Sequence, residues 1–549
     1  MSDVLLVHPN DDMVVALRDL EVGQSVQVGG ETIEIREPIP AKHKFARYSV
    51  AAGQCQTMYG ITVGRTVAAV QAGTRLTVQN LQHAVDSLQD RQAQNAWQPP
   101  NIEEWQNQQF QGYHRPDGRV GVRNIWLVVP LVFCQNRNVD VIRQALQSRL
   151  GYSRPDRFES LTERLIQMHR SGAQPSQILE SDFTTKSNGL DHSPIFENVD
   201  GVKFLTHESG CGGPYEDAQT LCGLLAGYMN HPNVAGTTVL SLGCQKSTVA
   251  ALQDELHKRN SNYSRPVYIL EQQQIGTEQS LLEQAIKHTF AGMVQANQLT
   301  RQPAALSQLA IGVECGGSDG FSGLSANPAI GACSDLVVAL GGRVILSEFP
   351  ELAGCENELV ARCSSAESAE RFLQIMQAYS SRAQRDGGGF DQNPSPGNVA
   401  DGLITDAMKS AGAARKGGTS PIMDVLDYPE PATKAGLNLL CTPGGDVEST
   451  TAMAGSGATI QLFSTGLGTP TGNPVSPVIK VSSNSQLVQR MPDLIDVDAG
   501  GIITGQESIE SMGQKLLQMI IATANGDYTT KAESLQQDDF IPWRRGISI

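Results

Sequence analysis

"ECGGSDGFSGLSANPAIG", from Glu314 to Gly331, is the stretch that decides the fold. It packs five glycines and three serines behind the apolar run "LAIGV". Glycine adds no side chain to a core and costs backbone entropy, so a packed interior does not need it. A backbone that turns sharply at a strand end and approaches a bound group does. Since the pattern of a phosphate loop is absent, the stretch predicts a loop for a carboxylate or polyol, with Asp319 able to bind a cation.

Four other apolar runs of strand length end in the same way, in Cys, His, Gly or Gln. They are "NIWLVVPLVFC" (124–134), "VKFLTHESGCGG" (202–213), "TTVLSLGCQ" (237–245) and "RPVYILEQQQ" (265–274). Helical patterns such as "AQTLCGLLAGYMN" (218–230) lie between them. Alternation of this kind predicts an α/β fold with mostly parallel sheets, in which ligands bind at the carboxyl ends of the strands.

The chain divides into four segments by composition and hydrophobic pattern. Residues 1–85 read as short strands separated by turns, which predicts a small all-β module. Residues 86–111 are polar and rich in Gln, and we interpret them as a linker. Residues 112–304 and 305–549 form two α/β parts, the first with a mostly helical insertion at 151–196.

Composition narrows the class of protein. The 549 residues carry a net charge of −16, which disfavours nucleic-acid binding. No apolar run is long enough to cross a bilayer, and the N-terminal residues do not resemble a signal peptide. We therefore expect a cytoplasmic protein without a membrane partner. The ten cysteines include no CxxC pair, so thiols or metal ligands are expected rather than disulfides or a zinc ribbon.

Four cysteines end predicted strands: Cys134, Cys211, Cys244 and Cys315. If the strands are neighbours, their thiols could gather at one sheet edge as an iron or iron–sulfur site, because thiolates select such metals. The alternative is that they are small buried residues that let the backbone turn. The pattern leaves both interpretations open.

Other candidates also lie at strand ends. His207 could be a base or a metal ligand, or a structural histidine. In "ILSEFPE" (345–351), Glu348 lies nearer the strand end than Glu351 and is preferred as a ligand or acid/base group. His43 and Lys44 could reach a substrate anion, and Lys480 could pair with a carboxylate, although surface positions would explain all three.

Together these residues resemble the altronate/galactarate dehydratase family over nearly the whole chain. The motifs include "PAKHKFARYSV" (40–50), "GYHRPDGRVGVRN" (112–124), "GCGG" (210–213), "LGCQ" (242–245), "ILSEFPELAGCE" (345–356), "NPSPGN" (393–398), "KGGTSPIMDVLDY" (416–428), "FSTGLGTPTG" (463–472) and "IDVDAG" (495–500). The resemblance, closest to the altronate branch, implies an N-terminal SAF module of β-clip type.

It also implies a hydro-lyase that removes the C2 proton and the C3 hydroxyl of a sugar acid to give a 2-keto-3-deoxy acid. The expected cofactor is a divalent metal, Fe²⁺ before Mn²⁺, with an iron–sulfur cluster less favoured. The shared motifs, which also include Asp496, suggest residues for three roles. The expected catalytic residues are His43, His207, Lys409 and Lys480. The expected substrate-binding residues are Ser318, Ser322, Asn327, Asn398 and Thr465, and the expected metal ligands are Asp319, Glu348, Cys315, Cys211 and Cys244.

The sequence departs from the family pattern at several positions. Leu467 stands where the family has Arg, Gln245 where it has Glu, and Val399 where it has Lys, and Ser209 and Gly210 precede Cys211 in place of the usual "YG". Loss of an Arg removes a bidentate clamp for carboxylates. Two alternatives therefore stay open: a lyase acting on another 2-hydroxy acid, such as galactarate or sulfolactate, and a non-catalytic sugar-acid sensor. Homo-oligomer formation is also left open.

Overall fold

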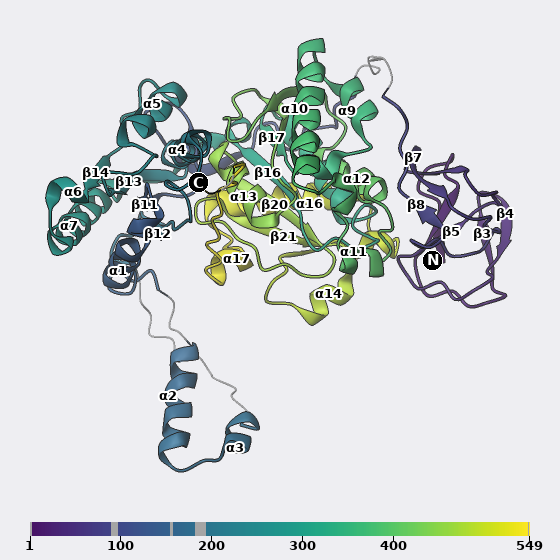
Figure 1. Ribbon diagram of the computed structural model, residues 1–549, viewed down its shortest axis with the longest axis horizontal. Helices are drawn as coiled ribbons and strands as arrows, with labels where there is room; N and C mark the ends of the chain where they lie inside the picture. Colours follow the sequence, from purple (N-terminus) through teal and green to yellow (C-terminus); the bar gives the residue numbers. More distant parts are fainter. Residues whose placement is uncertain (1–2, 89–96, 154–156, 182–193, 547, 549) are drawn as a thin grey trace.

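The computed structural model describes residues 3–88, 97–153, 157–181, 194–546 and 548. The expected linker at 86–111 and insertion at 151–196 fall partly outside these residues. The chain is arranged as three parts in a row: the N-terminal module at one end, a large central part next to it, and the first α/β part at the other end (Figure 1).

The N-terminal module consists of short antiparallel strands. Its sheets have the orders β1-β2-β5, β3-β4 and β6-β7-β8. The strands are β1 (Val4–Leu5), β2 (Met13–Ala16), β3 (Ser25–Val28), β4 (Glu31–Glu34), β5 (Lys44–Ala46), β6 (Cys55–Met58), β7 (Ile61–Thr66) and β8 (Leu81–Gln82). A further antiparallel sheet joins β9 (Gln109–His114), β10 (Val120–Gly121) and β15 (Gln302–Ala305).

The first α/β part is built on a four-stranded parallel sheet of order β12-β11-β13-β14. Its strands are β11 (Ile125–Pro130), β12 (Gly201–Phe204), β13 (Val234–Ser241) and β14 (Val267–Glu271). Both β11 and β13 are buried along their full length, which explains why they read as continuous apolar runs. The helices are α1 (Asn136–Leu146), α4 (Tyr215–Met229), α5 (Val249–Arg259), α6 (Gln272–Ile275) and α7 (Glu278–Ala296).

The central part is built on a seven-stranded parallel sheet of order β18-β19-β17-β16-β20-β21-β22. Its strands are β16 (Ala310–Cys315), β17 (Arg343–Leu346), β18 (Ile422–Leu426), β19 (Gly436–Leu440), β20 (Ile460–Thr465), β21 (Val478–Ser482) and β22 (Val497–Asp498). The chain leaves β16 towards β17 and later returns on its other side as β20. The strand order therefore reverses at β16, where open α/β sheets bind their ligands. The α/β fold with a strand-rich N-terminal module is confirmed.

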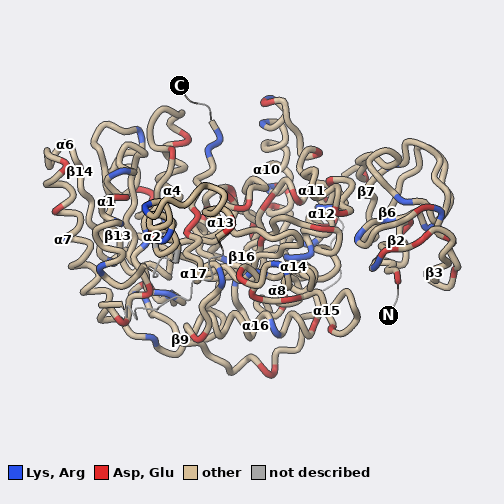
Figure 2. Tube along the Cα trace, turned by 90° about the horizontal axis from the view of Figure 1, so that it is seen from below, with Lys and Arg blue, Asp and Glu red and all other residues tan. Residues whose placement is uncertain are grey.

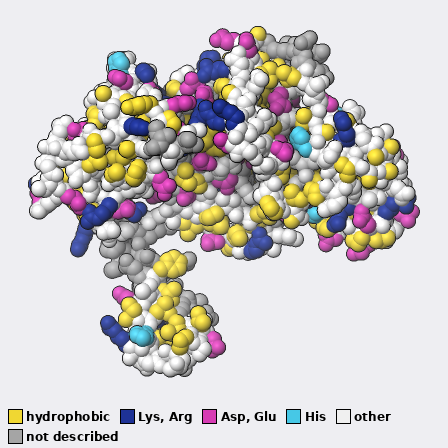
Figure 3. All heavy atoms as spheres, in the orientation of Figure 1, with side chains coloured by type: hydrophobic (Ala, Val, Ile, Leu, Met, Phe, Trp, Pro, Cys, Tyr) yellow, Lys and Arg dark blue, Asp and Glu magenta, His cyan; other side chains and the backbone are white. Residues whose placement is uncertain are grey.

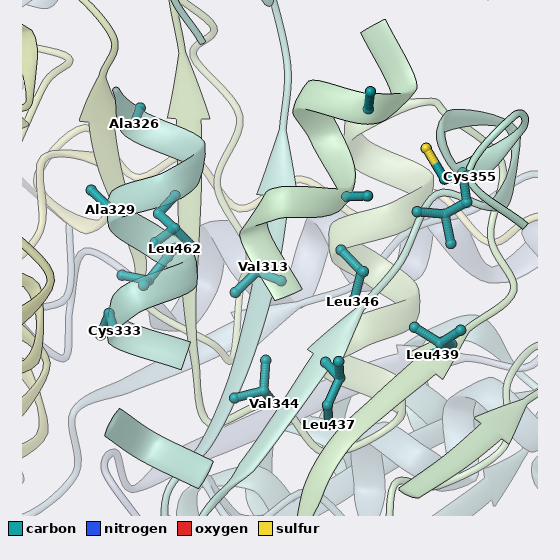
Figure 4. Packing of buried hydrophobic residues seen from close by; sticks show 14 of the residues in the cluster. Val313, Ala326, Ala329, Cys333, Val344, Leu346, Cys355, Leu437, Leu439 and Leu462 are labelled. Atoms are coloured by element: carbon teal, nitrogen blue, oxygen red, sulfur yellow. The ribbon is translucent and has the colours of Figure 1, made fainter. Parts of the chain in front are cut away.

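The core of the central sheet is aliphatic. Side chains from four parallel strands and from α8 interdigitate, among them Val313, Val344, Leu437 and Leu462 (Figure 4). The covering helices are α8 (Ala326–Ala339), α9 (Glu356–Arg362), α10 (Ala366–Arg385), α11 (Pro396–Ala400), α12 (Asp406–Ala413), α13 (Asp446–Gly455), α14 (Ser485–Arg490), α15 (Gly500–Ile503), α16 (Ile509–Asn525) and α17 (Lys531–Ser534).

The N-terminal module docks on the central part through polar contacts. Lys44 Nζ is fully buried and donates a 2.7 Å hydrogen bond to the carbonyl of Gly402. The Thr405 hydroxyl donates to the carbonyl of Val63 at 2.6 Å. Module and central part also share one hydrophobic cluster, which contains Met13 and Val313 alike. The module is therefore packed as part of the central body.

An arm formed by α2 (Arg157–Arg170) and α3 (Pro175–Leu179) projects away from the body (Figure 1). It carries exposed apolar side chains at Phe158, Ile166 and Leu179, and apolar atoms are visible on its drawn face (Figure 3). Acidic and basic residues are interspersed along the rest of the chain (Figure 2). Among the described residues, no helix is both long and apolar enough to span a membrane.

Candidate functional site

A group of buried polar side chains lies at the point where the strand order reverses. Cys315 is the last residue of β16, and Glu348 and Glu351 lie in the turn that follows the neighbouring strand β17. Their ligand atoms, one per residue, all lie within 4.8 Å of one another. In the described part of the chain, no other group of three His, Cys, Asp or Glu residues meets this criterion.

Lys416 joins the three residues together. Its Nζ donates to Glu348 Oε2 at 2.7 Å and to Cys315 Sγ at 2.8 Å, and its side chain is 1% exposed. The Cys315 thiol in turn donates to Glu351 Oε2 at 3.0 Å. The four side chains thus form one continuous network inside the protein.

Two further groups extend this network towards the surface. Lys409 Nζ lies 2.6 Å from Glu351 Oε1 and donates to Asn393 Oδ1 at 2.5 Å. Asp446, half-buried at the start of α13, lies beside the Gly316 backbone, where an added Cβ would come within 2.2 Å of its carboxylate. Gly444, two residues before Asp446, is exposed.

Glu314 lies behind the network. Its Oε2 accepts hydrogen bonds from the hydroxyls of Ser347 at 3.0 Å and Ser449 at 2.6 Å. Burial, together with the nearby charge of Glu348, raises its pKa well above the ordinary value. Glu314 therefore favours the protonated form unless additional positive charge is present.

Burial and charge shift the other carboxyl groups in different directions. Burial and then Glu351 raise the pKa of Glu348, while burial and then Glu348 raise that of Asp446 to about 7. For Glu351, the attraction of Lys409 and Lys416 outweighs burial and lowers the pKa. The same negative surroundings outweigh burial at Lys416 and raise its pKa, so it stays an ammonium group.

The backbone at Glu348 is strained. It adopts φ 66° and ψ 62°, a left-handed conformation that non-glycine residues rarely take. Such a conformation persists only where the surroundings hold it, and it is concentrated at functional sites. Its amide is fixed by donation to Thr442 Oγ1 at 2.8 Å. The strain aims the carboxylate into the network.

The residues fit a divalent metal ion. Two ammonium groups face four carboxyl groups: Lys409 and Lys416 against Glu314, Glu348, Glu351 and Asp446. Glu348 Oε1 and Glu314 Oε1 are buried, and neither meets a donor among the described residues unless Glu314 is protonated, in which case Glu314 bonds to Glu348. A bound cation can replace that proton and offset the negative charge of the group. Carboxylates suit hard cations such as Mn²⁺, and a thiolate suits softer metals.

A second polar cluster lies where the N-terminal module meets the same loop. Asp319 is fully buried and accepts from the hydroxyls of Ser322 at 2.8 Å and Ser483 at 2.7 Å. Lys42 Nζ lies 3.1 Å from Asp319 Oδ2 and 2.6 Å from Asp401 Oδ2. Asp319 therefore anchors the module to the loop and is held apart from the Cys315 group.

Lys44 gives this interface a pH dependence. Burial lowers its pKa from 10.5 to about 7. Below pH 7 the buried Lys44 is charged in the folded protein, which lowers the free energy of unfolding. Between pH 7 and 10.5 the unfolded chain binds more protons than the folded protein, so the free energy of unfolding rises with pH. We expect wild type to gain roughly 3–5 kcal/mol relative to Lys44→Met between pH 7 and 10 in urea unfolding. Lys258→Met, at a 65% exposed side chain, is the control, and equal slopes for both variants would contradict a buried Lys44.

The five predicted substrate-binding residues gather around the loop. Asn398 Nδ2 donates to the Ser318 carbonyl at 2.8 Å, and Asn327 Nδ2 to that of Gly412 at 3.0 Å. The Thr465 hydroxyl accepts from the Gly468 amide at 3.0 Å. The Ser322 hydroxyl donates to Asp319, so most of these polar groups form hydrogen bonds within the protein and shape the loop. Their role in substrate binding stays a prediction.

Several predicted residues lie elsewhere. His207 is buried in the first α/β part, where its Nε2 contacts the Pro130 carbonyl at 2.9 Å and burial lowers its pKa to about 4. Lys480 points to Gln537 at 2.8 Å, and burial lowers its pKa to about 8. Asp496 accepts from the Lys480 amide at 2.7 Å. His43 lies in the module, with Nδ1 3.3 Å from the Ala41 carbonyl.

The four strand-end cysteines do not form one group. Cys315 ends a strand of the seven-stranded sheet, whereas Cys134, Cys211 and Cys244 follow strands of the four-stranded sheet. Cys315 is buried and the other three are exposed. Gln245 lies with them and donates to Ser241 Oγ at 2.7 Å, so this family departure is remote from the Cys315 group.

Sequence reasoning missed three members of the site. Lys416 and Glu314 lie within stretches quoted above, "KGGTSP" and "ECGG", and Asp446 lies in the glycine-containing stretch "TPGGDVES" (442–449). Lys416 and Asp446 each lie beside glycines, the same signal that drew attention to Cys315. Glu351, rated below Glu348, is a full member of the group.

Comparisons with known proteins identify the family of the chain. Family models match residues 2–84 (altronate/galactarate dehydratase SAF domain), 112–297 (D-galactarate dehydratase/altronate hydrolase, second domain) and 306–548 (D-galactarate/altronate dehydratase, C-terminal). The altronate dehydratase of Escherichia coli K12 is 32% identical over 523 residues, covering 95% of each chain.

Two other relatives show how far the similarity extends. The galactarate dehydratase (L-threo-forming) of Escherichia coli K12 is 30% identical over 95% of this chain and 93% of its own. The (2R)-sulfolactate sulfo-lyase subunit beta of Chromohalobacter salexigens is 28% identical over 79% of this chain and 96% of its own. The chain belongs to the D-galactarate/altronate dehydratase family of hydro-lyases.

Proposed function

We propose that the chain is a metal-dependent dehydratase of an altronate-like aldonate, with the Cys315 group as its catalytic centre. The observation that carries the proposal is the buried set Cys315, Glu348 and Glu351 at the point where the strand order reverses. When bound there, Fe²⁺ or Mn²⁺ supplies positive charge to the substrate's carboxylate oxygens and so makes the C2 proton more acidic.

The protein's own groups then have separable tasks. Lys409 and Lys416 remain ammonium groups, so they stabilise negative charge that develops on the substrate rather than act as bases. Asp446 is half-buried, whereas the other carboxyl groups of the site are fully buried, so we expect Asp446 to exchange a proton with the substrate. Removal of the C2 proton and protonation of the departing C3 hydroxyl give an enol that tautomerises to the 2-keto-3-deoxy acid.

We expect Asp446→Asn to lower kcat by at least about 100-fold, as loss of a proton-transfer group does, while metal affinity changes little. Steady-state kinetics and calorimetric titration with Mn²⁺ measure the two effects separately. Glu448→Gln, on the same helix, is the matched control. If Asp446→Asn keeps kcat within tenfold of wild type, Asp446 does not transfer the proton.

The proposed function is tested with a substrate panel. The protein is purified anaerobically and assayed with added Fe²⁺ on altronate, galactarate and (2R)-sulfolactate, with detection of keto-acid product, sulfite and bound metal. Turnover of altronate supports the proposal. Turnover of galactarate or sulfolactate but not altronate would show that the proposed substrate is wrong. Binding of a sugar acid without bound metal and without turnover would show that the chain is a sensor and not an enzyme.

Leu467 bears directly on substrate choice. Its Cβ lies 3.5 Å from the position of a Cβ added at Gly317, so it borders the loop. An arginine there would offer a bidentate clamp to a second carboxylate. We expect Leu467→Arg to shift the ratio of kcat/KM for galactarate over altronate upward by about tenfold, equal to about 1.4 kcal/mol. Leu467→Met keeps the size without the charge, and an equal shift in both variants would refute the clamp.

We also propose a cytoplasmic location and self-association. Four cysteines, Cys55, Cys134, Cys211 and Cys244, are exposed thiols, which suits a reducing compartment. The apolar side chains on the projecting arm favour contact with a second copy of the chain. The expected partner beyond that is a small sugar acid, and the net charge of −16 disfavours nucleic acid.

A further inference from the structure

Three exposed thiols share one edge of the four-stranded sheet. Cys134, Cys211 and Cys244 follow β11, β12 and β13, which are neighbours in the order β12-β11-β13. Cysteine is among the most buried residue types, and six of the ten cysteines here are buried. Three of the four exposed ones therefore lie in the turns that follow three adjacent parallel strands. Small buried turn residues do not explain this placement.

The three turns are tied into one unit by their backbones. The Phe133 amide, next to Cys134, donates to the Ser209 carbonyl at 3.1 Å. The amides of Lys246 and Ser247 both donate to the carbonyl of Gly210, the residue before Cys211, at 3.0 and 3.2 Å. Each bond joins residues within three positions of two of the cysteines. The thiols are thus presented by a single preorganised surface.

The same turns offer unused hydrogen-bond donors. In the described part of the chain, the amides of Cys211, Gly212, Cys244 and Gln245 donate no hydrogen bond. Glycines with positive φ shape the turns: Gly210 (100°), Gly212 (73°) and Gly243 (119°). Concave runs of free amides bind anions and the sulfur atoms of iron–sulfur sites.

The spacing of the thiols excludes a single ion as they stand. Two sulfur ligands of one zinc ion, at about 2.3 Å each, lie at most about 4.6 Å apart. Among the described residues, the one group of three ligands that lies within 4.8 Å is that of Cys315, so the three exposed sulfurs are spread more widely. A cluster with several metal atoms spans a wider set of thiolates.

We propose that Cys134, Cys211 and Cys244 hold an iron–sulfur cluster on this edge of the sheet. Each thiol loses its proton on binding iron, and the free amides face the negative sulfur atoms. Protein-bound clusters commonly take four thiolates, so three leave one iron with a position for a non-protein ligand. The site is separate from the Cys315 group.

Reconstitution of the full chain tests the proposal. The protein is incubated without oxygen with ferric and ferrous salts in equal amounts and with sulfide, which together balance a [4Fe–4S]²⁺ cluster. We expect about four sulfide per chain, with about four iron in addition to any ion at the Cys315 group, and visible charge-transfer absorption. Cys134→Ser, Cys211→Ser and Cys244→Ser should each lower the bound sulfide at least fivefold. Cys55→Ser, at an exposed thiol of the N-terminal module, should not.

A second measurement needs no variant. Cluster-loaded wild type should protect the three thiols from iodoacetamide and leave Cys55 reactive, as peptide mass spectrometry shows. Absence of bound sulfide in the iron-loaded protein, or equal labelling of all four thiols, overturns the proposal. Glu348→Gln should keep the cluster, so failure of this site is distinct from failure of the proposed function.

Discussion

We expect Glu348→Gln to abolish metal binding and turnover while the chain stays folded. The amide keeps the size of the side chain and removes the charge that Lys416 Nζ contacts at 2.7 Å. It also replaces one of the two carboxylate oxygens, the atoms that could bind a cation, with an NH₂ group that cannot. The loss in kcat/KM should reach about 1000-fold, or about 4 kcal/mol of transition-state stabilisation.

Calorimetric titration with Mn²⁺ and turnover of the best acid in the panel measure the two losses. Glu358→Gln is the control, since its side chain is 49% exposed on α9, close by in sequence but outside the group. If Glu348→Gln keeps its activity, the metal does not bind at the Cys315 group. Loss of activity with unchanged Mn²⁺ affinity would make Glu348 a proton-transfer group rather than a ligand.

The sequence predicted the fold well because buried parallel strands are readable. β16 is buried at every residue and appears as an apolar run, and the glycine-rich stretch follows it directly. The strand-end rule then placed Cys315 and Glu348 correctly on one edge, because β16 and β17 pair in parallel. Residues at the carboxyl ends of two parallel strands meet at one edge of the sheet whenever the two strands are neighbours.

The sequence could not say which sheet each strand joins. Cys211 and Cys244 follow predicted strands as Cys315 does, but they lie in turns after β12 and β13, which belong to another sheet. Lys416 was missed for a different reason: it lies in the 3₁₀ turn Ala414–Gly417 that follows α12, and it reaches Cys315, 101 positions earlier in the chain. Only tertiary packing brings such a long side chain to its partner.

We expect Lys416→Met to destabilise the metal-free protein by about 3–5 kcal/mol, the cost of leaving a buried charge unpaired. Its ammonium is the shared partner of Glu348 and Cys315, and its side chain is 1% exposed. Urea unfolding measures the loss. Lys434→Met, at a 53% exposed lysine paired with Asp424, should change stability by less than about 0.5 kcal/mol.

Mn²⁺ should then restore part of the lost stability in Lys416→Met, because a divalent cation supplies the positive charge that the lysine provided. At a concentration 100 times its Kd, binding to the folded state alone contributes about 2.7 kcal/mol. If the metal-free variant is as stable as wild type, protons rather than Lys416 neutralise Glu348. If Mn²⁺ stabilises wild type but not Lys416→Met, Lys416 positions the ligands instead of substituting for the ion's charge.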